Sequence, residues 1–315
     1  PRSAADARVD TTLFKLDLAA RPLARLSVHA GYRHYQTDNK TPRDLYLRVV
    51  NDTSDQVLLT DIEAKYNQPY DTTRDQLKLE GSWYFGGGST LKLGWDRDQK
   101  AYTLRAVDKT AENSVSARLN KRWEAGQTAY LDLGKGRRRS DGYDATRVFE
   151  NVHTSDYLDP ANLPPGEYFD SLPGMRQYDI ADRDSARQGF GVTILPMPDM
   201  TVSLIAHHQG EDYDASQFGL QERDIRNATL EMTLVPDEFS SWSFYYTRQE
   251  TDWLQASWAY GWGNKDTYLT DPPQNWTARN QDAIDTLGAN VMLSFMEDIL
   301  PVRDRCQRDR QQQRT

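Results

Sequence analysis

The stretch DQLKLEGSWYFGGGSTLKLGWDRDQ, residues 75–99, decides the fold class of this chain. In its first half the apolar residues share one face of an extended chain: Leu77, Leu79, Trp83 and Phe85. The polar residues between them share the other face: Gln76, Lys78, Glu80 and Ser82. Residues 89–99 repeat this alternation after three glycines at 86–88. A period of two predicts two β-strands, and the glycines predict a tight hairpin turn between them.

The same hairpin unit recurs along the sequence. Four further pairs of alternating runs lie at 14–20 and 23–35, 115–123 and 128–136, 189–196 and 200–208, and 228–235 and 241–249. Turn residues join the two runs of each pair, and the first pair is joined by Arg21 and Pro22. A last run, 285–295, stands alone. These patterns predict about eleven antiparallel strands within residues 1–295.

The connections between the predicted strands alternate in length. Short turns lie near residues 21, 86, 124, 197 and 237, whereas long polar segments occupy about 38–72, 140–181 and 255–281. Short turns at one end and long loops at the other are typical of an outer-membrane barrel, with periplasmic turns and extracellular loops. We therefore predict an all-β fold, an antiparallel transmembrane β-barrel of the outer membrane.

Each predicted strand has an apolar face and a polar face. This is the pattern of a barrel wall, which has lipid on one side and water on the other. The polar face would line the lumen with Lys78, Glu80, Lys92, Asp96, Arg118, Asn120 and Asp132. A closed soluble core could not bury that set without partners. Aromatic residues near the short turns are candidates for an interfacial girdle: Trp83, Phe85, Trp123, Trp242 and Phe244.

Composition narrows the class of protein. Only 37% of the 315 residues are hydrophobic and the mean hydropathy is −0.81, yet 17 Tyr and 8 Trp argue against disorder. No window approaches the roughly 18 consecutive apolar residues that a transmembrane helix needs, so a membrane span must be made of strands. The net charge of −9 argues against a nucleic-acid partner.

The residue patterns of catalysis and cofactor binding are missing from the sequence. Cys306 is the only cysteine, so there is no CxxCH haem-attachment motif and no zinc cluster. The five histidines lack metal-ligand spacing, and His207 and His208, being adjacent in a strand, point to opposite faces. No phosphate loop or nucleophile motif occurs. We expect no catalytic, cofactor-binding or metal site and no enzymatic activity.

The segment SLPGMRQYDIADRDSARQGF, residues 171–190, brings charged residues and turn formers together just before a predicted strand. Asp179, Asp182 and Asp184 lie close together in it, and oxygen ligands of this kind suit Ca²⁺. A second acidic stretch contains Glu211, Asp212 and Asp214. Neither stretch has the EF-hand pattern, so for both we favour ion pairs with three arginines: Arg176, Arg183 and Arg187.

Three stretches carry a resemblance to a known family. LPGMRQYDIADRD (172–184), YNQPYDTTRDQLKLEGSW (66–83) and NQDAIDTLGANVMLSF (280–295) resemble motifs of the MtrB/PioB family of decahaem-associated outer-membrane proteins. Within the first stretch, the candidate rim or partner-contact residues are Arg176, Tyr178, Asp182 and Arg183. We expect them to fix the return of the loop or to touch an enclosed partner.

The resemblance implies a specific task. Members of the family look like barrels that ensheath a periplasmic decahaem c-type cytochrome, with a second multihaem cytochrome docking outside the cell. Electrons then pass across the bacterial outer membrane to or from extracellular metal. The haem would belong to the partner and not to this chain.

Two features depart from a complete barrel of this kind. About eleven strands are too few to enclose a cytochrome, so we expect a fragment of a larger barrel that lacks an N-terminal region. The charged tail at 296–315 has no strand pattern and is expected to lie outside the barrel. Two other functions stay open: a general or substrate-specific outer-membrane channel, and a soluble secreted β-sandwich or glycan-binding protein.

Overall fold

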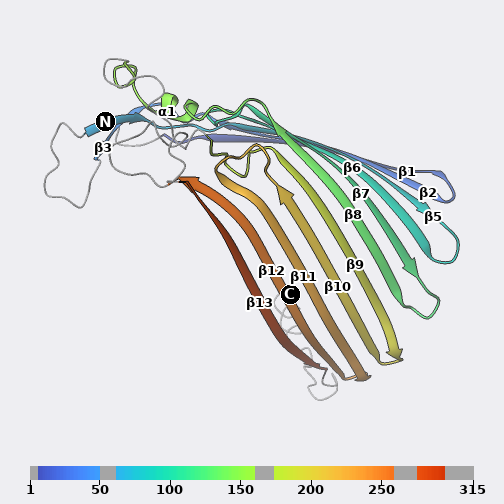
Figure 1. Cartoon of the computed structure of the whole chain (residues 1–315). Helices are drawn as coiled ribbons and strands as arrows, with labels where there is room; N and C mark the ends of the chain where they lie inside the picture. Colours follow the sequence, from blue (N-terminus) through green and yellow to red (C-terminus); the bar gives the residue numbers. More distant parts are fainter. Residues whose placement is uncertain (1–5, 50–61, 160–173, 259–274, 295–315) are drawn as a thin grey trace, which may run out of the picture.

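The computed structural model describes residues 6–49, 62–159, 174–258 and 275–294. These residues form almost entirely antiparallel β-structure, dominated by one eleven-stranded sheet (Figure 1). The predicted fold class is confirmed. The predicted tail at 296–315 lies outside the described residues.

The sheet follows the sequence without a crossover. Its strands, in spatial order, are β1 Val9–Leu23, β2 Leu26–Asn39, β5 Thr72–Tyr84, β6 Ser89–Tyr102, β7 Lys109–Arg122, β8 Thr128–Ser140, β9 Arg183–Met197, β10 Met200–Asp212, β11 Gly219–Asp237, β12 Ser240–Trp258 and β13 Asn275–Leu293. Each strand pairs with the next along the chain, as in an up-and-down barrel wall. Within the described chain β1 and β13 each have one strand neighbour, so the sheet has two open edges.

The register between neighbouring strands places apolar residues opposite apolar residues and polar residues opposite polar ones. Lys78 of β5 lies opposite Asp96 of β6, and Leu79 lies opposite Trp95. Because directly paired residues point to the same face, apolar residues meet apolar residues from strand to strand. One face of the sheet is therefore apolar over the half of each strand nearest the short turns, and the opposite face is polar.

The first turn differs from the prediction. The chain reverses at Ala24 and Arg25, not at Arg21 and Pro22, and β1 continues through Pro22. The pairing shifts between Ala20 and Leu23, so Pro22 sits at an irregularity of the ladder. A proline has no amide hydrogen, and it is tolerated in an edge strand at such a point.

The long connections carry small elements that the alternation pattern does not predict. β3 Leu45–Val49 and β4 Ile62–Tyr66 form a separate hairpin, and α1 Arg147–Val152 is a single short helix. Both lie at the end of the sheet that carries the long connections (Figure 1). Runs of five or six residues are too short to show a period. Among the described residues, no helix is long and apolar enough to cross a membrane.

The sheet is a single layer. Over the described residues only eight hydrophobic side chains are buried, whereas large apolar residues along the strands are exposed. Within the described chain no second large sheet lies beside this one, unlike the arrangement that the β-sandwich alternative requires. An apolar face of this extent needs lipid to cover it, which is how a barrel wall in a membrane is stabilised.

Candidate functional site at the loop-side rim

The described end of the β8–β9 connection, residues 174–182, folds over the polar face at the rim that carries the long connections. Ile180 is fully buried there against Ala106 and Val107 of the β6–β7 connection, and Tyr102 and Tyr143 pack around them. This small apolar cluster holds two connections together. It makes the rim the best-packed part of the described wall.

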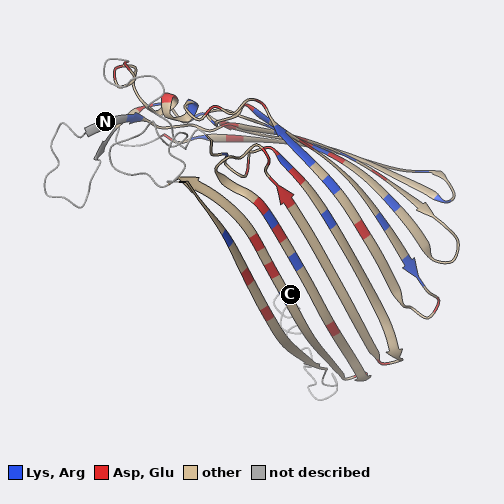
Figure 2. Ribbon diagram, viewed as in Figure 1, with Lys and Arg blue, Asp and Glu red and all other residues tan. Residues whose placement is uncertain are grey.

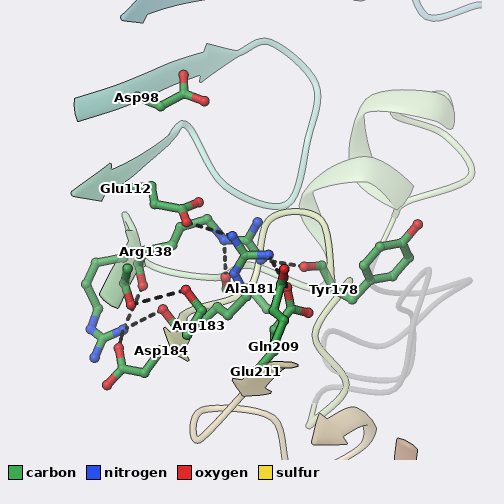
Figure 3. Close-up of polar contacts among 12 residues, drawn as sticks. Asp98, Glu112, Arg138, Tyr178, Ala181, Arg183, Asp184, Gln209 and Glu211 are labelled. Atoms are coloured by element: carbon green, nitrogen blue, oxygen red, sulfur yellow. Dashed lines mark hydrogen bonds and ion pairs between the residues drawn. The ribbon is translucent and has the colours of Figure 1, made fainter. Parts of the chain in front are cut away.

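Arg138 fastens this segment to the wall from the end of β8. Its side chain is buried; its Nε donates to the carbonyl of Ala181 at 2.7 Å, and a second guanidinium nitrogen donates to the carbonyl of Tyr178 (Figure 3). A guanidinium can satisfy two carbonyls at once because its donors form a rigid fork. Arg138 is the middle residue of three consecutive arginines, 137–139, just beyond the predicted strand 128–136. Such a run predicts an exposed strand end, whereas the Arg138 side chain is buried.

The centre of the rim is a network of alternating charges. Arg183, the first residue of β9, lies 2.7 Å from Glu112 of β7 and 2.9 Å from Glu211 of β10. Glu211 also pairs with Arg223 of β11 at 2.6 Å, and its side chain is only 1% exposed. The members of the network come from four strands, β7, β9, β10 and β11, so it ties these strands together. Figure 3 labels three of its members, Glu112, Arg183 and Glu211.

Two neutral groups complete the coordination of the Glu211 carboxylate. The hydroxyl of Tyr213 donates to it at 3.0 Å, and the amide of Gln209 donates at 2.8 Å. Burial and the adjacent Glu211 carboxylate raise the pKa of Tyr213, which keeps its hydroxyl protonated as a donor. A buried carboxylate with this many donors is satisfied, and the site is a structural clamp.

The aspartates of the segment find partners other than the predicted ones. Asp182 accepts from the backbone amide and the hydroxyl of Ser140, both at 2.7 Å. Asp179 pairs with Arg105 at 2.7 Å, and Asp184 pairs with Arg139 at 2.7 Å. For Asp179, Asp182 and Asp184 the predicted pairs with Arg176, Arg183 and Arg187 are wrong, because their observed partners come from connections and strands that only the fold brings close. For the second acidic stretch the pair of Glu211 with Arg183 is confirmed.

The four candidate rim residues divide into two kinds. Asp182 and Arg183 are bound into the wall, as described above. The Arg176 guanidinium stacks over the Tyr143 ring at 4.3 Å, whereas the Tyr178 side chain is 59% exposed and points away from the cluster. Tyr178 is therefore the aromatic member of this set whose side chain is left exposed.

A substitution of Asp182 tests whether its hydrogen bonds to Ser140 anchor residues 174–182 to the wall. Asp182→Ala removes two hydrogen bonds from a carboxylate, and we expect a loss of about 1–3 kcal/mol in local stability. Faster amide exchange in residues 174–182 would report it. Asp179→Ala is the matched control, because its exposed ion pair contributes less than about 1 kcal/mol. Equal exchange in the two variants would contradict the anchoring role of Asp182.

The polar face below the rim contains the predicted lumen residues. Glu80 lies 2.8 Å from Lys92 and 3.3 Å from Lys78, and Arg118 donates to Asn120. Asp132 lies 3.8 Å from Arg187. The described residues contain no group of three or more histidine, cysteine or carboxylate side chains placed to hold a metal ion.

The predicted girdle residues lie beside the short turns at the other end of the wall. Trp83, Phe85, Trp123, Trp242 and Phe244 all have exposed side chains. Trp83 pairs with Leu26 and Leu91, and Trp242 pairs with Leu234 and Val291. Their apolar neighbours place Trp83 and Trp242 on the apolar face of the sheet.

A single-layer sheet, apolar on one face and ion-paired on the other, with a clamped rim, defines the wall of an outer-membrane β-barrel. The chain belongs to the MtrB/PioB family, described as "Putative outer membrane beta-barrel porin, MtrB/PioB", whose model matches residues 1–303. It is similar to "Outer membrane protein MtrB" of Shewanella baltica (strain OS185), with 24% identity over 296 residues. That match covers 92% of this chain and 37% of the relative, so the chain spans little more than a third of that protein's length.

Proposed function

We propose that this chain forms part of a porin-like sheath that encloses a periplasmic decahaem c-type cytochrome. The assembly supports electron transfer across the outer membrane, in extracellular metal reduction or oxidation. In this proposal the chain binds no haem and catalyses no reaction, and its long connections face outward. An extracellular multihaem cytochrome would dock on that side.

The flatness of the polar face is the observation that carries this proposal. Large side chains lie flat over glycines of neighbouring strands: Tyr130 over Gly191, His207 over Gly189, Arg187 over Gly134 and Tyr245 over Gly288. A Cβ atom at Gly191 would lie 2.3 Å from the Tyr130 ring, so the ring occupies the space that a side chain would need. A level wall suits a close-fitting protein core within the barrel.

The charges of the same face favour a protein partner of mixed polarity. Lysine, arginine and carboxylate side chains are interspersed and paired, as in the contacts of Glu80 with Lys78 and Lys92. Partly exposed pairs of this kind can exchange partners at low cost, because an exposed ion pair contributes little. The wall can thus form many polar contacts without a strong field of one sign.

The proposal is tested by co-purification. The full-length protein, tagged and solubilised from the native host, is expected to elute with a haem-staining partner. In planar bilayers the purified assembly is expected to conduct ions poorly, because the partner fills the lumen. A haem-free eluate that conducts ions freely would refute the sheath and support the alternative, an open outer-membrane channel, which the same polar wall also suits.

A further inference from the structure

The apolar face of the wall ends at a row of cations on its loop side. On β6 and β8, the outward residues Trp95 and Leu133 are followed two positions further toward the loops by Arg97 and Lys135. On β11 and β12, Ala228 and Tyr246 are followed in the same way by Arg226 and Arg248. We call Arg97, Lys135, Arg226 and Arg248 the basic row.

Most of the basic row has no partner in the described chain. All four side chains are exposed, and Arg97, Lys135 and Arg226 form no ion pair with any described residue. Arg248 alone is paired, with Glu250 at 2.7 Å and Asp285 at 3.6 Å. The polar face behaves differently, because its charges are largely paired with one another. Arg97 and Lys135 therefore present positive charge without an ion-pair partner beside the apolar face, whereas Arg226 lies opposite Glu250 across the strand pair.

Acidic residues at the same level are already occupied. Asp75 of β5 accepts hydrogen bonds from Tyr32 and His34, both shorter than 3 Å. Asp285 of β13 accepts from Tyr246 at 2.6 Å and lies beside Arg248. Glu250 of β12 lies directly opposite Arg226 in the register and pairs with Arg248. One step further toward the loops on β11, Asp224 lies 2.6 Å from His208. Basic and acidic residues are interspersed along the strands of the described wall (Figure 2).

Two shallow grooves cross from the apolar face to the basic row. One, of about 400 Å³, has Leu131, Phe190 and Ala206 in its lining, together with three charged residues: Arg226, Arg248 and Glu250. The other, of about 440 Å³, is lined by Leu93 and Leu133 and by Lys135. Each groove thus combines an apolar floor on the membrane side with a cation on the loop side. Such a shape fits an acyl chain that ends in a phosphate.

We propose that the basic row binds the phosphate groups of phosphorylated glycolipids in the outer leaflet, whose acyl chains lie in the two grooves. Lysine and arginine at the edge of an apolar surface reach toward the headgroup level, and guanidinium forks match phosphate geometry. Each such side chain contributes about 1 kcal/mol of attraction to an anionic surface. The inference needs only the outer-membrane location and outward-facing loops, and does not depend on a cytochrome partner.

The test is the binding of diphosphoryl lipid A to the full-length protein in neutral detergent. The double variant Lys135→Gln/Arg226→Gln is expected to bind about 25-fold more weakly, from about fivefold for each side chain. Lys100→Gln/Arg33→Gln is the matched control, because it removes the same charge from the polar face and is expected to keep wild-type binding. Equal binding by the two double variants would overturn the proposal.

Two further measurements separate lipid from free phosphate and from misfolding. Lipid A without phosphates is expected to bind the wild type and the row variant equally, and inorganic phosphate alone is expected to bind far more weakly than the lipid. Binding of diphosphoryl lipid A to the unmodified protein is expected to weaken as salt is raised. Inorganic phosphate that binds as tightly as the lipid, or affinity that is insensitive to salt, would refute the assignment.

Discussion

Leu230→Arg is expected to destabilise the barrel by about 2–4 kcal/mol, the cost of an arginine near the middle of a lipid-facing wall. Leu230 lies on β11 between Leu204 and Tyr246 in the register, within the apolar face. Its side chain is exposed in the sheet, so lipid must cover it in the membrane. The measurement is the denaturant midpoint of the full-length protein refolded into lipid vesicles.

The neighbouring Thr229 provides the control for this experiment, because it points to the opposite face. Its hydroxyl contacts that of Thr247 at 2.9 Å, and Thr229→Arg should cost about 1 kcal/mol through that lost hydrogen bond. The arginine itself would extend into the polar lumen. If Thr229→Arg proved the more damaging variant, the assignment of the two faces would be reversed.

Arg183→Met is expected to destabilise the rim by about 3 kcal/mol. The substitution keeps the length of the side chain but leaves Glu112 and Glu211 without the cation that lies between them. The penalty for breaking a buried ion pair from one side is large, because the remaining charge stays desolvated. A lower temperature of the heat-induced mobility shift on a gel would report the loss.

Arg187→Met is the matched control for the rim variant. Arg187 lies on the same face of β9, is 56% exposed, and approaches Asp132 only to 3.8 Å. An exposed pair of this kind contributes less than about 1 kcal/mol. If both variants lowered the transition temperature equally, the Arg183 network would stabilise the rim no more than an exposed ion pair does.

The parts of the fold that could be predicted from the sequence are those with a clear alternation of apolar and polar residues. The strands at 75–85 and 89–99 could be predicted because the alternation of apolar and polar residues is visible among neighbouring residues. The structure has β5 and β6 at these positions. The turn at Ala24 and Arg25 was mispredicted, since proline marks turns on average but also fits an irregular edge strand. α1 and the β3–β4 hairpin were missed because they are too short to show a period.

The candidate site was predictable only in part. The segment 174–182 could be singled out by its charges, and the sequence by itself determined that it adjoins a strand, which face of each strand is apolar, and that the connections alternate in length. It could not assign Asp179 to Arg105 or Asp182 to Ser140, more than 40 residues away. Long-range pairing depends on which strands become neighbours, and on the register between them. Only the tertiary structure therefore decided that Arg183 clamps Glu112 to Glu211, and that four separate cations form one row along the edge of the apolar face.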